Sequence, residues 1–98
     1  MDLYLLVSIA EMIAAANDMN RAMESYQEAV AQCKSAGDDL ASKWEGEAKE
    51  AFVAHQETAF SWYKQMIQTV LQMVDVVRKA ADEYTRMEET VKSIIHGA

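Results

Sequence analysis

The side chains that could carry catalytic or metal-binding chemistry are few in this chain and lie far apart. The 98 residues include two histidines, His55 and His96, and a single cysteine, Cys33. No Cys-x-x-Cys pair is present, so the usual ligand spacing of a metal site is missing from the sequence. His55-x-Glu57 resembles a fragment of a deaminase motif, but no Pro-Cys-x-x-Cys follows it. With no glycine-rich phosphate loop either, we expect a non-enzymatic protein without a cofactor or a metal ion.

The composition indicates what kind of element holds these side chains. The chain has no proline and only three glycines, at positions 37, 46 and 97, and the stretches between them are rich in good helix formers. The length allows one small domain with a thin core. We therefore expect an all-α fold with few elements. A hydrophobic content of 51% is high for such a chain, which indicates that part of the apolar surface is covered by a partner.

The charge and the N-terminal segment limit the environments in which the chain acts. A formal charge of −7 argues against a nucleic-acid partner and against attraction to anionic lipid. Residues 3–10 are mostly apolar, but Asp2 stands where a signal peptide carries basic residues, and Glu11 interrupts the apolar stretch. We expect no cleaved signal peptide and no membrane span, and we expect the chain to be made in the cytoplasm.

Apolar side chains recur at steps of three and four residues in both halves of the chain, as expected for helices. In the first half they run from Leu5 to Cys33, and their spacing predicts that Cys33 is buried. Gly37 suits a helix C-cap, where a left-handed residue is favoured. These signals predict one helix over about 3–37, a bend over about 38–46 and a second helix over about 47–95.

The second helix carries two apolar stripes, one more than a partner helix in a simple hairpin needs. The chain is therefore predicted to form an antiparallel helix-turn-helix hairpin that dimerises into a four-helix bundle. Residue 37 is expected opposite residue 46, so residues after about 80 extend beyond the first helix by roughly 20 Å. Seven residues are predicted to pack in the core or the dimer: Met23, Tyr26, Val30, Phe52, Trp62, Met66 and Met73.

The bend carries a motif that resembles a known family. Leu40, Trp44, Gly46, Ala48 and Phe52 form Leu-x-x-x-Trp-x-Gly-x-Ala-x-x-x-Phe, which is similar to the WXG-100 family of small early-secreted-antigen-like (Esx) substrates of type VII secretion. Chain length, acidity and the lack of proline also agree with this family. Trp44 then either plugs the end of the bundle or takes part directly in recognition, and Gly46 either adopts a positive φ or allows close approach of the helices.

A second motif near the C-terminus also resembles the family. Tyr84, Glu88, Val91 and Ile95 match its export signal, an aromatic residue, an acidic residue and two apolar residues on one helix face. The resemblance implies a protein that dimerises in the cytoplasm and is secreted as a folded unit after recognition by an ATPase of the FtsK/SpoIIIE type. The dimer partner is either a second copy or a related hairpin.

Two other functions remain open at the sequence level. The chain could instead be a cytosolic targeting chaperone that pairs with the helical N-terminal domain of a larger secreted toxin. It could also be an effector whose amphipathic helices insert into membranes after secretion, which the acidic charge argues against.

Overall fold

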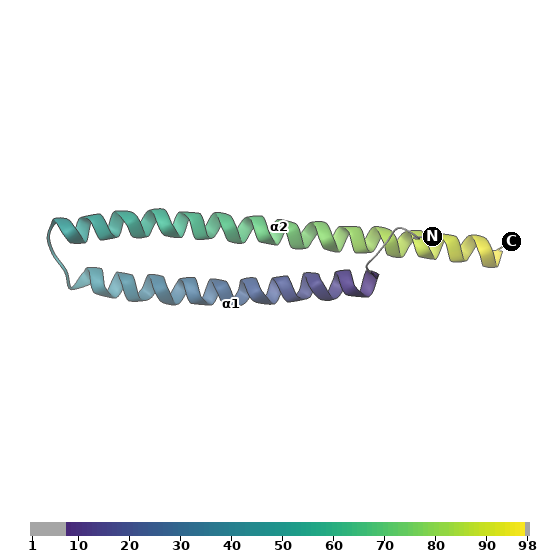
Figure 1. Cartoon of the computed structure of the whole chain (residues 1–98), viewed down its shortest axis with the longest axis horizontal. Helices are drawn as coiled ribbons and strands as arrows, with labels where there is room; N and C mark the ends of the chain where they lie inside the picture. Colours follow the sequence, from purple (N-terminus) through teal and green to yellow (C-terminus); the bar gives the residue numbers. More distant parts are fainter. Residues whose placement is uncertain (1–7, 98) are drawn as a thin grey trace.

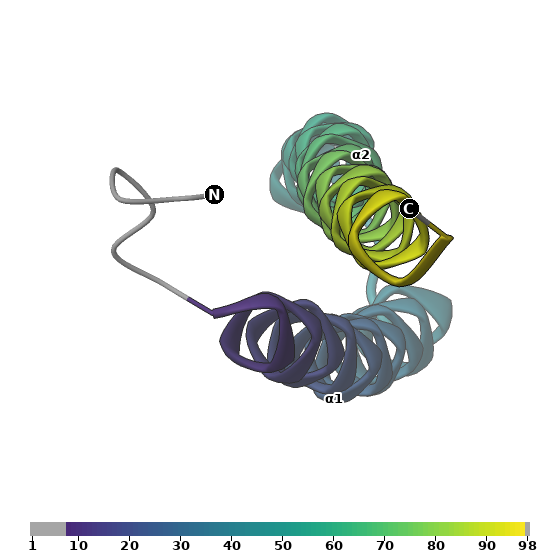
Figure 2. The ribbon, with the colours of Figure 1, turned by 90° about the vertical axis from the view of Figure 1, so that its right-hand side faces the viewer.

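The chain folds into two antiparallel α-helices joined by a short bend, as the computed structural model shows for residues 8–97. Helix α1 spans Ile9–Ser42 and helix α2 spans Glu47–Gly97. Figures 1 and 2 show the helices side by side in a single layer, so nothing within residues 8–97 covers either broad side of the pair. The molecule is elongated, with extents of 78 × 20 × 16 Å. The predicted all-helical hairpin is confirmed.

Helix α1 begins at a capping serine. The Ser8 hydroxyl accepts a hydrogen bond from the Glu11 backbone N–H at 3.0 Å, and so satisfies one of the donors that a helix start leaves free. Glu11 also places a negative charge in the first turn, where the helix dipole favours it. Residues 3–7, where we predicted the helix to start, lie outside the described part of the chain.

The predicted end of the first helix at Gly37 is wrong, because α1 continues five residues further, to Ser42. Gly37 lies inside the helix, where a Cβ atom would overlap the Gln56 side-chain amide and lie 3.3 Å from the Phe52 ring. The glycine therefore lies inside α1, where side chains of α2 pack closely against it, and does not cap α1. The bend shrinks from the predicted 38–46 to residues 43–46.

The two helices meet along small and aliphatic side chains. The buried residues in the described part of the chain are Ala16, Val74 and Ala81. Tyr26 and Tyr63 add an edge-to-face pair across the helices, with ring centroids 6.0 Å apart. So thin a core agrees with the marginal stability expected of an isolated hairpin of this size.

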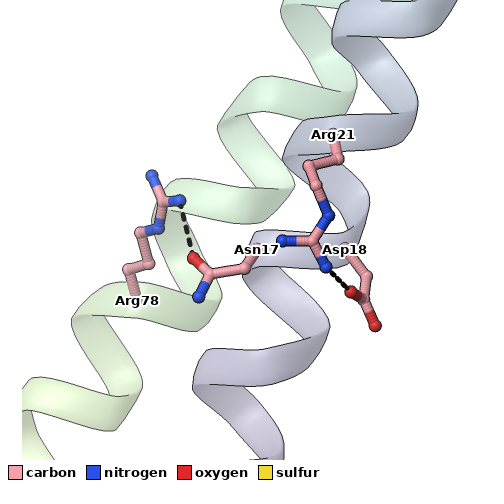
Figure 3. A network of polar contacts seen from close by, with 4 residues as sticks. All are labelled: Asn17, Asp18, Arg21 and Arg78. Carbon is pink, nitrogen blue, oxygen red and sulfur yellow. Dashed lines mark hydrogen bonds and ion pairs between the residues drawn. The ribbon is translucent and has the colours of Figure 1, made fainter.

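Two polar contacts between the helices lie near opposite ends of their overlap. Near the bend, Gln56 donates a hydrogen bond to the Asp38 carboxylate at 2.8 Å. Towards the open end, Arg78 of α2 donates to the Asn17 side-chain oxygen at 3.2 Å, as Figure 3 shows, while Arg21 pairs with Asp18 along α1. Both contacts join helix positions that face each other only in this register, so they help to set it.

The longer α1 also changes how much of α2 extends beyond its partner. We expected residues after about 80 to be free, yet Ala81 is buried, and Tyr84 and Thr85 are half-buried. Residues 86–97 are all exposed and form the projecting end of α2 seen in Figure 1. We call residues 86–97 the overhang; its twelve residues extend about 18 Å. None of the helices within residues 8–97 is long and apolar enough to cross a membrane.

Candidate functional site

The bend is built around Gly46. Its φ of +110° lies in the region that residues with a Cβ rarely adopt, and nothing lies within 4 Å of where a Cβ would stand. Of the two roles predicted for Gly46, the structure therefore supports the conformational one and gives no support to close helix approach. The Gly46 carbonyl then accepts the Glu50 N–H at 3.2 Å, the first helical hydrogen bond of α2.

Trp44 lies at the end of the hairpin, where its backbone N–H still bonds to the Ala41 carbonyl at 3.3 Å. Its ring packs on Phe52 of α2 with centroids 5.8 Å apart and an interplanar angle of 45°. The side chain is half-buried, so it both covers the end of the thin core and offers part of its ring to solvent. This position is compatible with either role predicted for Trp44.

The four residues of the predicted export signal lie on one face of α2, but in two different settings. Tyr84 is half-buried at the edge of the helix overlap, whereas Glu88, Val91 and Ile95 are exposed on the overhang. Ile95 keeps 67% of its surface exposed. The overhang therefore offers a short apolar ridge that carries one carboxylate, on a helix with no neighbour among the described residues.

The seven predicted packing residues divide into two groups. Met23, Tyr26, Val30 and Phe52 are partly buried, and Tyr26 and Phe52 make the aromatic contacts described above. Trp62, Met66 and Met73 are exposed, with Trp62 at 68% and Met73 at 51%. Of the two apolar stripes predicted for α2, the one that contains Tyr63, Val74 and Ala81 faces α1.

The exposed stripe runs along one side of α2. We call Trp62, Met66, Met73 and Val76 the free seam; steps of four, seven and three residues place them on one face of the helix. The same spacing continues through Met87, Val91 and Ile94, so the apolar face runs on into the overhang. Charged residues of α2 between positions 51 and 78 are Glu57, Lys64, Asp75 and Arg78. At 100° per residue, none of the four lies on the side of the free seam.

A shallow apolar groove borders this face near the bend. Cys33, Ala36 and Leu40 of α1 line it together with His55, Ala59 and Tyr63 of α2. Cys33 is exposed, so its predicted burial is wrong for the hairpin alone. Small residues on α1 thus lie beside the large ones of the free seam. The spacing of Ala29, Cys33, Ala36 and Leu40 also follows steps of three and four, but spacing alone does not show that these residues form an exposed surface.

The described residues hold no group of three metal-binding side chains that could share an ion. What residues 8–97 offer is apolar helix surface: a bend with an aromatic plug, a free seam and an overhang. Such features define a small helical-hairpin protein with apolar helix surface exposed to solvent.

Comparison with known proteins agrees with this class. The family model WXG100, described as proteins of 100 residues with WXG, matches residues 5–89, and the chain therefore belongs to that family. The matched span includes Trp44 and Gly46 as well as Tyr84 and Glu88, while Val91 and Ile95 follow it. Neither the curated proteins nor the solved structures contain a significant match to the chain.

Proposed function

We propose that two copies of this chain associate through the face that carries the free seam, and that the folded dimer is exported by a type VII secretion system. The dimer forms in the cytoplasm. The overhang then serves as the export signal and is recognised by an ATPase of the FtsK/SpoIIIE type. Membership of the WXG100 family supports a protein of the secreted type, and the overhang is the observation that carries the proposal for this chain.

The free seam supports association with another helical hairpin. Four large apolar side chains on one uncharged helix face are more than a small monomer usually exposes in one line. A second copy suits this face because each hairpin presents large residues on α2 and small ones, such as Cys33 and Ala36, on α1. A two-fold axis would place the large residues of each copy over the small residues of the other.

The overhang supports recognition by a separate protein. Its helix continues for about three turns beyond the last half-buried residue, Thr85, so its whole circumference is accessible. A groove that binds an amphipathic helix reads apolar residues three and four positions apart. Val91 and Ile95 supply those contacts, and the Glu88 carboxylate sets the register.

Removal of the overhang tests export without removing packed residues. Truncation after Thr85 keeps Ala81, Tyr84 and the whole helix overlap, so circular dichroism should still report a folded helical protein. Secretion from the native cell should be lost. A finer test replaces Glu88 by alanine and uses Glu89→Ala as the matched control, because Glu89 lies on a different side of the same exposed turn. Normal secretion of the folded truncation would refute the export role.

The targeting-chaperone function is the second candidate, and the free seam favours it as well. Met66 and Met73 have flexible side chains that adapt to different neighbours, so the same face could receive the helical N-terminal domain of a larger toxin. Purification from the native cell followed by mass spectrometry distinguishes the two. A second copy supports the homodimer, and a stoichiometric larger helical chain supports the chaperone.

A further inference from the structure

We infer that residues 3–7 of this chain pack on the apolar side of its own overhang. These five residues, Leu-Tyr-Leu-Leu-Val, are called the N-terminal segment. The inference gives the overhang a second ligand, from within the same chain, beside the separate protein that the proposed function assigns to it. The consequence for export rests on that proposed function, whereas the contact itself does not.

The overhang presents a broad apolar side to solvent. Its exposed large apolar side chains are Met87 at 46%, Val91 at 39%, Ile94 at 66% and Ile95 at 67%. At 100° per residue these four lie within an arc of about 100°, and Glu88 borders that arc. No residue in the described range 8–97 covers this side of the helix.

The N-terminal segment joins the hairpin at the level where the overhang begins. The hydrogen bond from Arg78 to Asn17, drawn in Figure 3, places these two positions level with each other in the antiparallel pair. Ser8 precedes Asn17 by nine residues and therefore lies level with about position 87 of α2. Beyond Ser8, an apolar stretch of chain and an uncovered apolar helix face start side by side.

The cap of α1 sets the direction in which this chain enters the helix. Ser8 has φ −84° and ψ 162°, so the chain reaches α1 from an extended conformation. Val7 and Met12 flank the cap at the spacing of a hydrophobic staple. Because Met12 is half-buried and lies one turn before the buried Ala16, the staple starts on the side of α1 that faces α2.

The length and the composition of the N-terminal segment match the surface beside it. Five extended residues reach about 17 Å, nearly the length of the overhang. The sequence has no charged residue between Asp2 and Glu11, so packing the segment on the overhang removes apolar surface of both from water and buries no charge. The segment is tethered at Ser8, which raises its effective concentration at the overhang into the millimolar range. Its own overhang is therefore favoured over that of a second copy at micromolar concentration.

This contact affects the proposed recognition of the overhang. Val91 and Ile95 belong both to the predicted export signal and to the apolar side that the N-terminal segment covers. A protein that binds these two side chains therefore competes with the segment and has to displace it. The overhang is then fully available only while it is being recognised.

Hydrogen exchange followed by mass spectrometry tests the contact on the purified full chain. Leu5 and Leu6 are replaced together by serine, because neighbouring side chains of an extended chain point to opposite sides. Amides of residues 86–97 should then exchange at least about fivefold faster, since the helix end loses its cover. Leu71→Ser is the matched control: Leu71 is an exposed apolar residue of α2 away from the overhang, and its replacement should leave this exchange unchanged. Unchanged exchange in the Leu5→Ser/Leu6→Ser variant would overturn the inference.

Chymotrypsin digestion tests the same contact from the other side. Cleavage within residues 3–7 should be at least about fivefold faster in the truncation after Thr85 than in the full chain, and circular dichroism checks that both are folded. Equal cleavage would overturn the contact and leave the export role intact. Normal secretion of the folded truncation would do the reverse. Protection that disappears when the full chain is diluted would assign the cover to a second copy and overturn the intramolecular contact.

Discussion

Replacement of Trp62 by alanine should separate self-association from folding. The indole keeps 68% of its surface exposed in the hairpin, although it is the largest side chain on the free seam. An exposed surface substitution typically changes folding free energy by no more than about 0.5 kcal/mol. The hairpin itself should therefore keep its helical signal when Trp62 is removed.

The dimer should respond much more strongly. A tryptophan can bury about 250 Å², so roughly 170 Å² of Trp62 remains for a partner to cover. At about 25 cal/mol per Å², covering this area contributes at most roughly 4 kcal/mol per protomer. An interface tryptophan that acts as a hot spot contributes at least about 2 kcal/mol, and we use this lower value. Two such residues per dimer weaken association by about 4 kcal/mol or more, which is about a thousandfold in the dissociation constant.

Sedimentation equilibrium over a range of concentrations measures this change. Leu71→Ala is the matched control, because Leu71 is also an exposed large apolar residue but lines a groove beside Gln27 and Lys64, away from the free seam. Its dissociation constant should stay within about threefold of the wild type, an energy change below 1 kcal/mol. In a Trp44→Phe background the remaining indole, Trp62, should shift to shorter fluorescence wavelengths as the protein associates. If Trp62→Ala dimerised with the wild-type dissociation constant, the free seam would not be the dimer interface.

Three further predictions concern the hairpin itself. Gly37→Ala should change the free energy of unfolding by less than about 1 kcal/mol, because the new methyl group displaces the flexible end of the Gln56 side chain while alanine favours the helix interior by about 1 kcal/mol. Gly97→Ala, with open space around it, should have little effect in the same urea titration. Gly46→Ala should cost about 1–2 kcal/mol through its positive φ alone, and a loss no larger than that of Gly97→Ala would contradict this. Hydrogen bonds from Lys34 and then Gln56 hold the pKa of Asp38 below its usual range, so this stabilisation is complete above that range and is lost as the pH falls through the lowered pKa. Asp38→Asn should therefore flatten the acid limb of a plot of melting temperature against pH, and an unchanged limb would show that other carboxylates dominate it.

The class of fold could be read from the sequence because its signals are local. Apolar steps of three and four residues, strong helix formers and the absence of proline act within each segment, whatever the rest of the chain does. Gly46 belongs with these signals, since a turn between two helices requires a residue that tolerates a positive φ. Together they are enough to predict two long helices and a bend near Trp44.

The candidate site could be predicted in part. Tyr84, Glu88, Val91 and Ile95 share a helix face by spacing alone, so their alignment needed no tertiary information. Their exposure to solvent could be determined only from the tertiary structure, because burial depends on which residues of α1 lie opposite them. The same is true of Cys33, whose apolar spacing is compatible with either the covered or the open side of a helix.

By itself, then, the sequence determined a helical hairpin of unequal arms and the motif that places it in its family. Only the tertiary structure decided where the first arm ends, because Gly37 is an end signal in isolation and a packing position once Gln56 lies against it. That longer arm covers Ala81 and leaves residues 86–97 free. The tertiary structure also decided which of the two apolar stripes of α2 faces α1. A local pattern shows that both stripes are apolar, but only packing shows that Val74 is covered and Trp62 is left for a partner.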